Sequence, residues 1–249
     1  MNERTLCWQL SENIYQSLIQ AIRTGRAHEV VGESSLGGTT RYFDQLAEQA
    51  VIDYLTTHDI ACTLISEEAG TITYGDDFTL ILDPVDGSNN AMAGLPFYCT
   101  SLAYLDGEKE YGLVRNLAWD EWFEGMSDYG VLRNGRPLRR MHRSTMVSLY
   151  TRRGRYVEEM RTFSSKLRCL GSVALEMCYV AHGSLLALVD ARGKMRATDF
   201  AAGKIVVENA GGVVSALDGS PLCMDDNHIN LVASSTPEIH EKILSIFNQ

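Results

Sequence analysis

The chain has 249 residues and a formal net charge of −10, from 22 Lys and Arg against 32 Asp and Glu. Its hydrophobic content of 45% and charged content of 22% are ordinary for a globular protein and exclude a collagenous or largely disordered chain. The acidic excess would repel phosphate backbones, so no nucleic-acid partner is expected.

The spacing of the cysteines and the lack of long apolar segments bear on the compartment in which the protein works. The six cysteines are spread along the chain and form no CxxC pair. The N-terminus has no basic segment followed by an apolar core, and no window approaches 18 consecutive apolar residues. We therefore expect a reduced, cytoplasmic protein with no membrane partner.

The first half of the chain is predicted to hold two helices and then strands. The first helix is indicated by apolar residues at every fourth position: Leu6, Leu10, Ile14, Leu18 and Ile22. Gly25 is predicted to end it, a second helix is predicted over residues 42–57, and the polar segment 29–41 between them is predicted to be a loop. Apolar runs predict strands at 60–65, 78–82, 100–105, 111–117 and 121–125.

The second half alternates between helices and short strands. Helices are predicted at 156–164, 172–181, 199–209 and 237–247, and strands at 167–169, 185–189, near 213 and at 231–233. This order predicts an α/β (α+β layered) fold. We expect one catalytic domain over residues 1–249, made of two closely packed lobes at about 1–125 and 126–249.

The most informative segment places two carboxylates after an apolar strand. In the run 79–90, TLILDPVDGSNN, the strand ends at Asp83, the chain turns at Pro84, and Asp86 follows. Two carboxylates about 6 Å apart repel by roughly 3 kcal/mol at an effective dielectric of about 20, so the pair requires a cation or a proton. The alternative is that both aspartates only shape a turn.

The residue types in this segment favour a hard cation and a phosphorylated substrate. Neither Cys nor His occurs there, and oxygen ligands favour Mg²⁺ or Mn²⁺ over zinc. Gly87 and Ser88 would expose backbone amides that can bind a phosphate.

Further acidic residues occupy similar positions. Glu67 and Glu68 follow another apolar strand, where α/β sheets collect their ligands. Asp199 stands at the start of an apolar helix, where it is either an N-terminal cap or a metal ligand.

Together these segments resemble the inositol monophosphatase family of magnesium-dependent, lithium-sensitive phosphatases. Residues 83–90, DPVDGSNN, are similar to its first signature, and residues 198–212, TDFAAGKIVVENAGG, to its second. Residues 66–68, SEE, match the Gly-Glu-Glu element upstream. The resemblance implies an alternating α/β/α/β/α sandwich.

The resemblance also implies the metal ligands. A first metal would bind Glu67, Asp83 and the Val85 carbonyl, and a second would bind Asp83, Asp86 and Asp199. A third, weaker metal would contact Glu67 through a largely hydrated shell, so two or three Mg²⁺ are expected, with Mn²⁺ as a possible substitute.

Water activation in this family implies further catalytic residues. Water activated by metal attacks phosphorus without a covalent phosphoenzyme. Ser88 would orient that water, and the Gly87 and Ser88 amides would hold phosphate oxygens. Many members also carry an Asp two positions before a Val-Thr pair, but here no carboxylate occurs between Glu33 and Asp44. Either Thr40 takes part of that role or Glu67 acts without it.

A second departure concerns the substrate. Members specialised for inositol phosphate have a Glu seven positions before the second-signature Asp, and the matching residue here is Arg192. A guanidinium favours a second anionic group, as in the branch that also hydrolyses fructose 1,6-bisphosphate, whereas the alternative is a solvated surface Arg. The complete expected set of substrate contacts is Asp86, Gly87, Ser88, Gly171, Ser172, Arg192 and Asp199.

The sequence thus predicts a Mg²⁺-dependent phosphomonoesterase that acts on inositol 1-phosphate, fructose 1,6-bisphosphate or both. A homodimer is expected. One alternative is a nucleotidase acting on adenosine 3′,5′-bisphosphate, and another is a binding module in an RNA-associated complex.

Overall fold

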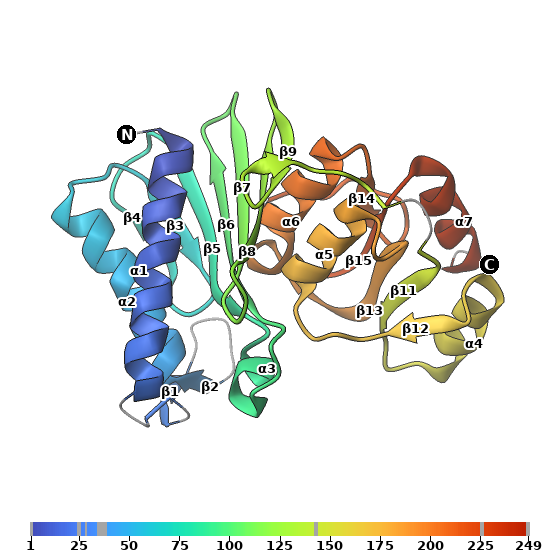
Figure 1. Ribbon diagram of the computed structural model, residues 1–249, viewed down its shortest axis with the longest axis horizontal. Coiled ribbons are helices and arrows are strands. Elements are labelled where there is room, and N and C mark those ends of the chain that lie inside the picture. The colour runs from blue at the N-terminus through green and yellow to red at the C-terminus, as the bar shows by residue number, and fades with distance from the viewer. Residues whose placement is uncertain are drawn as a thin grey trace.

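The computed structural model describes residues 2–23, 26–27, 29–33, 39–141, 144–224 and 227–247. These residues form five alternating layers of helices and sheets, so the predicted α/β/α/β/α arrangement is confirmed (Figure 1). Among the described residues, none of the helices combines the length and apolar character needed to cross a bilayer.

The first sheet has eight strands in the order β10-β9-β8-β7-β6-β5-β3-β4. They are β3 (Thr63–Ser66), β4 (Gly70–Thr73), β5 (Thr79–Asp86), β6 (Cys99–Leu105), β7 (Glu110–Asn116), β8 (Glu121–Met126), β9 (Gly130–Arg133) and β10 (Arg136–Pro137). Helices α1 (Glu3–Arg23) and α2 (Tyr42–Thr57) pack together on its outer face, on the left of Figure 1. Four residues of the apolar stripe of α1 are buried there, as its four-residue spacing predicts: Leu6, Leu10, Ile14 and Leu18.

The second sheet has five strands in the order β12-β11-β13-β15-β14. They are β11 (Met146–Tyr150), β12 (Lys166–Arg168), β13 (Ala187–Arg196), β14 (Val213–Ala216) and β15 (Asn227–Ser234). Helices α5 (Val173–His182) and α6 (Ala197–Asn209) lie between the two sheets, and α4 (Gly154–Phe163) and α7 (Pro237–Phe247) cover the far side (Figure 1). Both middle helices are buried along most of their length because sheets cover them on two sides.

Two glycines let α6 sit unusually close to the first sheet. A Cβ on Gly112 would lie 2.7 Å from the Ala202 carbonyl oxygen, and a Cβ on Gly125 would lie 2.9 Å from the Val206 Cα. Any larger residue at either position would push the helix outward. Because Asp199 lies in the first turn of α6, this close packing also sets its position relative to β5.

Several boundaries differ from the sequence prediction. The segment 29–41 is not simply a loop: β1 (Val30–Glu33) and β2 (Thr39–Arg41) pair antiparallel within it, and residues 34–38 lie outside the described part. The predicted helix end at Gly25 also lies outside the described residues. The first sheet continues to Pro137, past the expected lobe division near residue 125. The short helix α3 (Ser88–Ala93) directly follows β5.

Candidate functional site

Three predicted metal ligands meet at one edge of the first sheet. Glu67 follows β3, Asp83 lies in β5, and these two strands are parallel, so their carboxyl ends point to the same edge. Asp199 reaches this edge from α6. One carboxylate oxygen from each of the three residues lies within 4.8 Å of the others.

Asp83 is at the centre of this group. Its side chain is buried, and its Oδ1 accepts a hydrogen bond from the Val85 backbone N–H at 2.9 Å. Burial raises the pKa of Asp83 well above its usual range, and the negative charges of Glu67, Asp86 and Asp199 raise it further. The carboxylate therefore favours a proton or a bound cation at neutral pH.

Asp86 lies beside the three acids but is held by α5. Its Oδ2 accepts hydrogen bonds from the Ser172 hydroxyl at 2.7 Å and from the Ala174 backbone N–H at 2.8 Å. Burial raises the pKa of Asp86 to about 6, although these hydrogen bonds oppose the shift. Ser172 therefore holds Asp86 in place. The substrate contact expected of Ser172 stays a prediction.

Asp199 combines the two roles that its sequence position left open. It is the third residue of α6, and its Oδ2 accepts a hydrogen bond from the Arg196 backbone N–H at 2.8 Å. Burial and the neighbouring Glu67 raise the pKa of Asp199 to about 7. The side chain therefore caps the helix start and also belongs to the acidic cluster.

Arg196 is a contact that the sequence analysis missed. Its guanidinium makes an ion pair with Glu67, and its Nε lies 3.8 Å from the Asp199 Oδ2. One signal was present in the sequence: Arg196 lies three residues before Asp199, at the N-cap position of α6. That spacing gives no indication of a contact with Glu67, which is 129 positions away.

A second layer of acids lies behind Glu67. The Thr40 hydroxyl donates a hydrogen bond to Glu68, the second Glu of the pair. Thr40 therefore lies at the acidic region, and its part in water activation stays a prediction. Asp44 in the first turn of α2 is also buried here, and burial together with Glu68 and Glu67 raises its pKa to about 8. Many family members carry an Asp in the loop before the second helix, which this chain lacks. Asp44, four positions after Thr40, brings a carboxylate to the same region from within α2.

The turn after β5 contains a glycine in a left-handed conformation and is tied to a distant segment by a hydrogen bond. Gly87 is the N-cap of α3 with φ of 89°, a left-handed conformation that favours glycine, and Ser88 is the first helical residue. The Asn90 Nδ2 donates to the carbonyl oxygens of Phe97 and Leu170, each at 2.7 Å. This amide therefore ties α3 to the segment that carries Gly171 and Ser172.

A pocket of about 450 Å³ opens in front of these residues. Its walls are Glu67, Asp86, Asn89, Asn90, Tyr150, Gly171, Val173, Arg192, Lys194, Met195, Arg196, Asp199 and His228. Arg192 is fixed in this wall: its Nη2 lies 2.5 Å from the buried Asp190 carboxylate, and its guanidinium stacks over Tyr150 at 4.3 Å. A bidentate ion pair and a ring contact do not describe a freely solvated side chain, so the surface alternative for Arg192 is disfavoured.

The donor set of the pocket fits a hard divalent cation. The cluster consists of three carboxylates, the pKa values of Asp83 and Asp199 are raised, and no Cys or His joins it in the described part of the chain. Crowded carboxylate oxygens suit Mg²⁺ or Mn²⁺.

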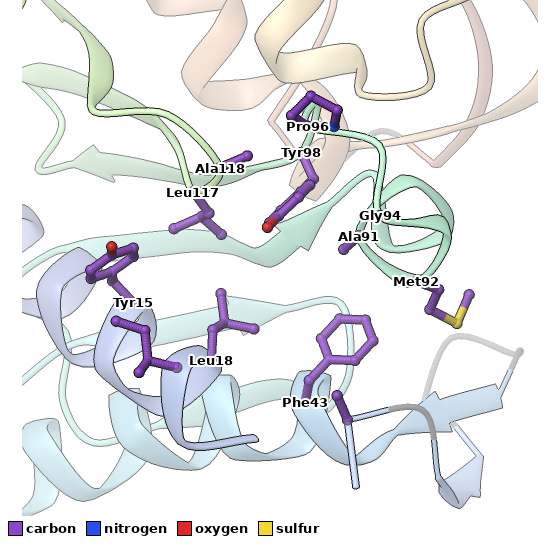
Figure 2. Close-up of a pocket in the computed structure, with 12 residues that line it drawn as sticks. Tyr15, Leu18, Phe43, Ala91, Met92, Gly94, Pro96, Tyr98, Leu117 and Ala118 are labelled. Carbon is purple, nitrogen blue, oxygen red and sulfur yellow. The ribbon is translucent and has the colours of Figure 1, made fainter. Parts of the chain in front are cut away.

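A second cavity, of about 490 Å³, has a different chemistry. Figure 2 shows Tyr15 and Leu18 of α1, Phe43 of α2 and Tyr98 around it, with Met92 of α3 at its side. None of its lining residues is acidic or basic. It therefore offers no carboxylate to hold a hard cation, and the groups suited to that role lie in the acidic pocket.

Relatives of known name agree with this geometry. A fructose-1,6-bisphosphatase/inositol-1-monophosphatase of Archaeoglobus fulgidus is 35% identical over 99% of both chains. A protein of the same name from Methanocaldococcus jannaschii is 31% identical over 87% of this chain and 88% of its own.

Solved structures give the same result. The crystal structure of an inositol monophosphatase–fructose 1,6-bisphosphatase superposes with a TM-score of 0.89 at 28% identity, covering 99% of this chain and all of the other. The model of the inositol monophosphatase family matches residues 5–249. The chain belongs to the inositol monophosphatase family and is a phosphoric monoester hydrolase.

Proposed function

We propose that this protein is a Mg²⁺-dependent phosphatase that hydrolyses inositol 1-phosphate, fructose 1,6-bisphosphate or both. The observation that carries the proposal is the pocket itself, in which a carboxylate cluster faces a wall that contains Arg192 and Lys194. Such a pocket suits a substrate with one phosphate at the acids and a second anionic group opposite.

Glu67, Asp83, Asp86, Asp199 and the Val85 carbonyl would hold the metal ions. When bound, Mg²⁺ supplies an acidified water and neutralises charge on the phosphate and the leaving oxygen. The support for this ligand set is the crowding of the carboxylates and the raised pKa values of Asp83, Asp86 and Asp199. Mn²⁺ would fit the same oxygen donors, and the number of ions is two or three.

The remaining roles fall to polar groups around the cluster. The Ser88 hydroxyl would orient the attacking water, and the backbone amides of Gly87 and Ser88 would hold phosphate oxygens. Thr40 would position Glu68 through its hydrogen bond, and Asp44 would accept a proton from the water. The raised pKa of Asp44, about 8, suits a proton acceptor that works near neutral pH.

Arg192 would select substrates with a second phosphate. Its ion pair with Asp190 and its contact with Tyr150 hold the guanidinium in one orientation, which lowers the entropic cost of binding an anion. Gly171 would contact the substrate through its backbone, and Ser172 would act through Asp86. The archaeal relatives whose names include both activities support a dual specificity.

A homodimer is the proposed assembly. Leu95 and Trp119 are exposed by 54% and 62%, which is high for large apolar side chains. Pro96, Phe97 and Trp119 line a hollow of about 530 Å³ on this face. In size-exclusion chromatography with light scattering, the wild-type protein is expected to elute as a dimer and Leu95→Asp as a monomer. A monomeric wild-type protein would rule this assembly out.

The cytoplasm is the proposed compartment. All six cysteines lie in the described part of the chain, where none of them forms a disulfide and four are buried. Free thiols are stable in a reducing compartment.

Phosphate release tests the proposed activity. Inositol 1-phosphate, fructose 1,6-bisphosphate and adenosine 3′,5′-bisphosphate are each supplied with Mg²⁺ and with a chelator. We expect Mg²⁺-dependent turnover of one or both sugar phosphates and little of the nucleotide. Preferential turnover of the nucleotide would instead support a nucleotidase, and no Mg²⁺-dependent turnover at all would contradict the proposal.

A further inference from the structure

The acidic cluster contains one basic side chain of its own. Among the ion pairs between described residues, Arg196 is the only Lys or Arg that contacts Glu67, Asp83, Asp86 or Asp199. The other cations of the pocket wall have different partners or positions: Arg192 pairs with Asp190, and Lys194 is exposed. The positive charge nearest the carboxylates therefore comes from Arg196.

The Arg196 side chain links the second sheet and α6 to Glu67 of the first sheet. Glu67 belongs to the first sheet, whereas Arg196 ends β13 of the second sheet and begins α6. Its side chain is only 16% exposed, so water screens the contact weakly. The backbone N–H of Arg196 caps with Asp199 independently of the guanidinium, so a side-chain substitution leaves this cap intact.

We propose that Arg196 is an internal counter-cation, a positioning residue that holds Glu67 in the metal-free protein and competes with divalent cations for the same carboxylates. This rests on the proposed function to the extent that the cluster binds such a cation. The guanidinium occupies an acceptor site of the Glu67 carboxylate and places a positive charge beside the cluster. The binding of a divalent cation there is therefore opposed by this contact and by the repulsion between the two positive charges.

The proposal predicts two opposite effects of removing the guanidinium. The metal-free protein loses the basic group that contacts Glu67 and Asp199, so it should melt at a lower temperature. The divalent cation no longer displaces a bound guanidinium, so it should bind more tightly. A residue that simply shaped the metal site would instead lower both the melting temperature and the metal affinity.

Mn²⁺ binding, followed by the electron paramagnetic resonance signal of the free ion, measures the competition without any substrate. We expect Arg196→Gln to lower the Kd for Mn²⁺ by about tenfold to a hundredfold, the range expected for a charge-assisted hydrogen bond. The melting temperature of the chelator-treated protein should fall in parallel. Lys204→Gln is the matched control, because it removes one charge from α6 but breaks only the pair with Glu208; its Kd should stay within about twofold of wild type.

Two further variants locate the effect. Arg196→Lys keeps the charge but loses the guanidinium that contacts both Glu67 and Asp199, so its Kd should fall less than that of Arg196→Gln. This variant also provides a test if Arg196→Gln does not fold without metal. In a Glu67→Gln background, Arg196→Gln should change the Kd by less than about threefold, because the competing ion pair is already lost.

Clear outcomes would overturn the proposal. An unchanged or higher Kd in both Arg196 variants would exclude competition, and an undiminished effect in the Glu67→Gln background would exclude Glu67 as the site of competition. These results leave the proposed function intact as long as wild-type protein binds Mn²⁺ and hydrolyses sugar phosphates. Conversely, tighter Mn²⁺ binding in the variants of a protein with no phosphatase activity would support the role of Arg196 and contradict the proposed function.

Discussion

Glu124 and Asp83 are both buried carboxylates, but their surroundings differ completely. Glu124 on β8 has no exposed surface and accepts hydrogen bonds from donors on α1 and on β7 and β8. The donors are Arg4 at 2.6 Å, Trp8 at 3.4 Å, Tyr111 at 3.0 Å and Trp122 at 3.2 Å. The protein itself therefore supplies every group that a buried negative charge needs.

Asp83 is surrounded mainly by other acids. It receives one backbone hydrogen bond, from Val85, and its near neighbours Glu67, Asp86 and Asp199 all raise its pKa. This difference separates a structural carboxylate, which is complete inside the fold, from a functional one, which is completed by something that binds. Substitutions at the two places should therefore affect different properties of the protein.

Asp83→Asn should give the largest effect. The loss of the central carboxylate should reduce kcat by about a thousandfold or more, equivalent to roughly 4 kcal/mol of transition-state stabilisation. The melting temperature of the metal-free protein should stay the same or rise, because one of several crowded charges is removed. If the variant kept more than about a tenth of the wild-type kcat at saturating Mg²⁺, Asp83 would not be a metal-bridging residue.

Asp199→Asn tests whether capping or chemistry dominates at the start of α6. The amide oxygen can still accept from the Arg196 N–H, so stability should change by less than about 1 kcal/mol. Phosphatase activity should nevertheless fall by about a hundredfold. An active but destabilised Asp199→Asn protein would show that this residue is only a helix cap.

Glu124→Gln should have the opposite signature. The neutral amide offers one acceptor and turns an NH₂ group towards donors, so the free energy of unfolding should fall by about 2–3 kcal/mol. The kcat of the protein that remains folded should be unchanged, because Glu124 lies outside the pocket. Urea denaturation and steady-state kinetics on the same preparation check both statements, and a large loss of kcat without loss of stability would contradict the comparison.

Arg192→Ala tests the substrate side of the pocket. A guanidinium that binds a second phosphate contributes roughly 1.5–3 kcal/mol, so kcat/KM for fructose 1,6-bisphosphate should fall about tenfold to a hundredfold. The value for inositol 1-phosphate should change less than about threefold. Both substrates are measured at one Mg²⁺ concentration, and equal losses on both would remove the reason to assign Arg192 to a second phosphate.

The smallest expected effect is a dependence of stability on pH. The folded-state pKa values of Asp86, Asp199 and Asp44 are raised to about 6, 7 and 8, so between about pH 4 and 8 the folded state holds more protons than the unfolded state. The metal-free protein should therefore lose stability as pH rises through this window, by at least a few degrees in melting temperature. Mg²⁺ should reduce the slope; a metal-free protein that becomes more stable from pH 5 to 8 would show that these acids are not crowded in solution.

The sequence determined the elements and the candidate acids. Both α2 and α7 have the predicted boundaries, because a periodic apolar face and flanking turn residues are local signals. The short spacing of Asp83 and Asp86 likewise limits how far apart they can lie, although β5 continues to Asp86 with an irregular register and does not end at Asp83 as predicted. Glu67 and Asp199 stood out by their positions in the sequence, the family resemblance implied that they are metal ligands, and the structure brings both to Asp83.

Tertiary structure decided the partners that lie far apart in the chain. Asp86 accepts from Ser172, 86 positions later, and Glu67 pairs with Arg196, 129 positions later. Asp44 was missed because nothing in the local pattern of α2 shows that its first turn faces Glu67 and Glu68. These contacts depend on how closely α6 packs on the first sheet and how the two sheets are oriented. Periodicity reports only which face of a helix or strand is buried, and the residues that it meets there are set by the packing of the whole fold.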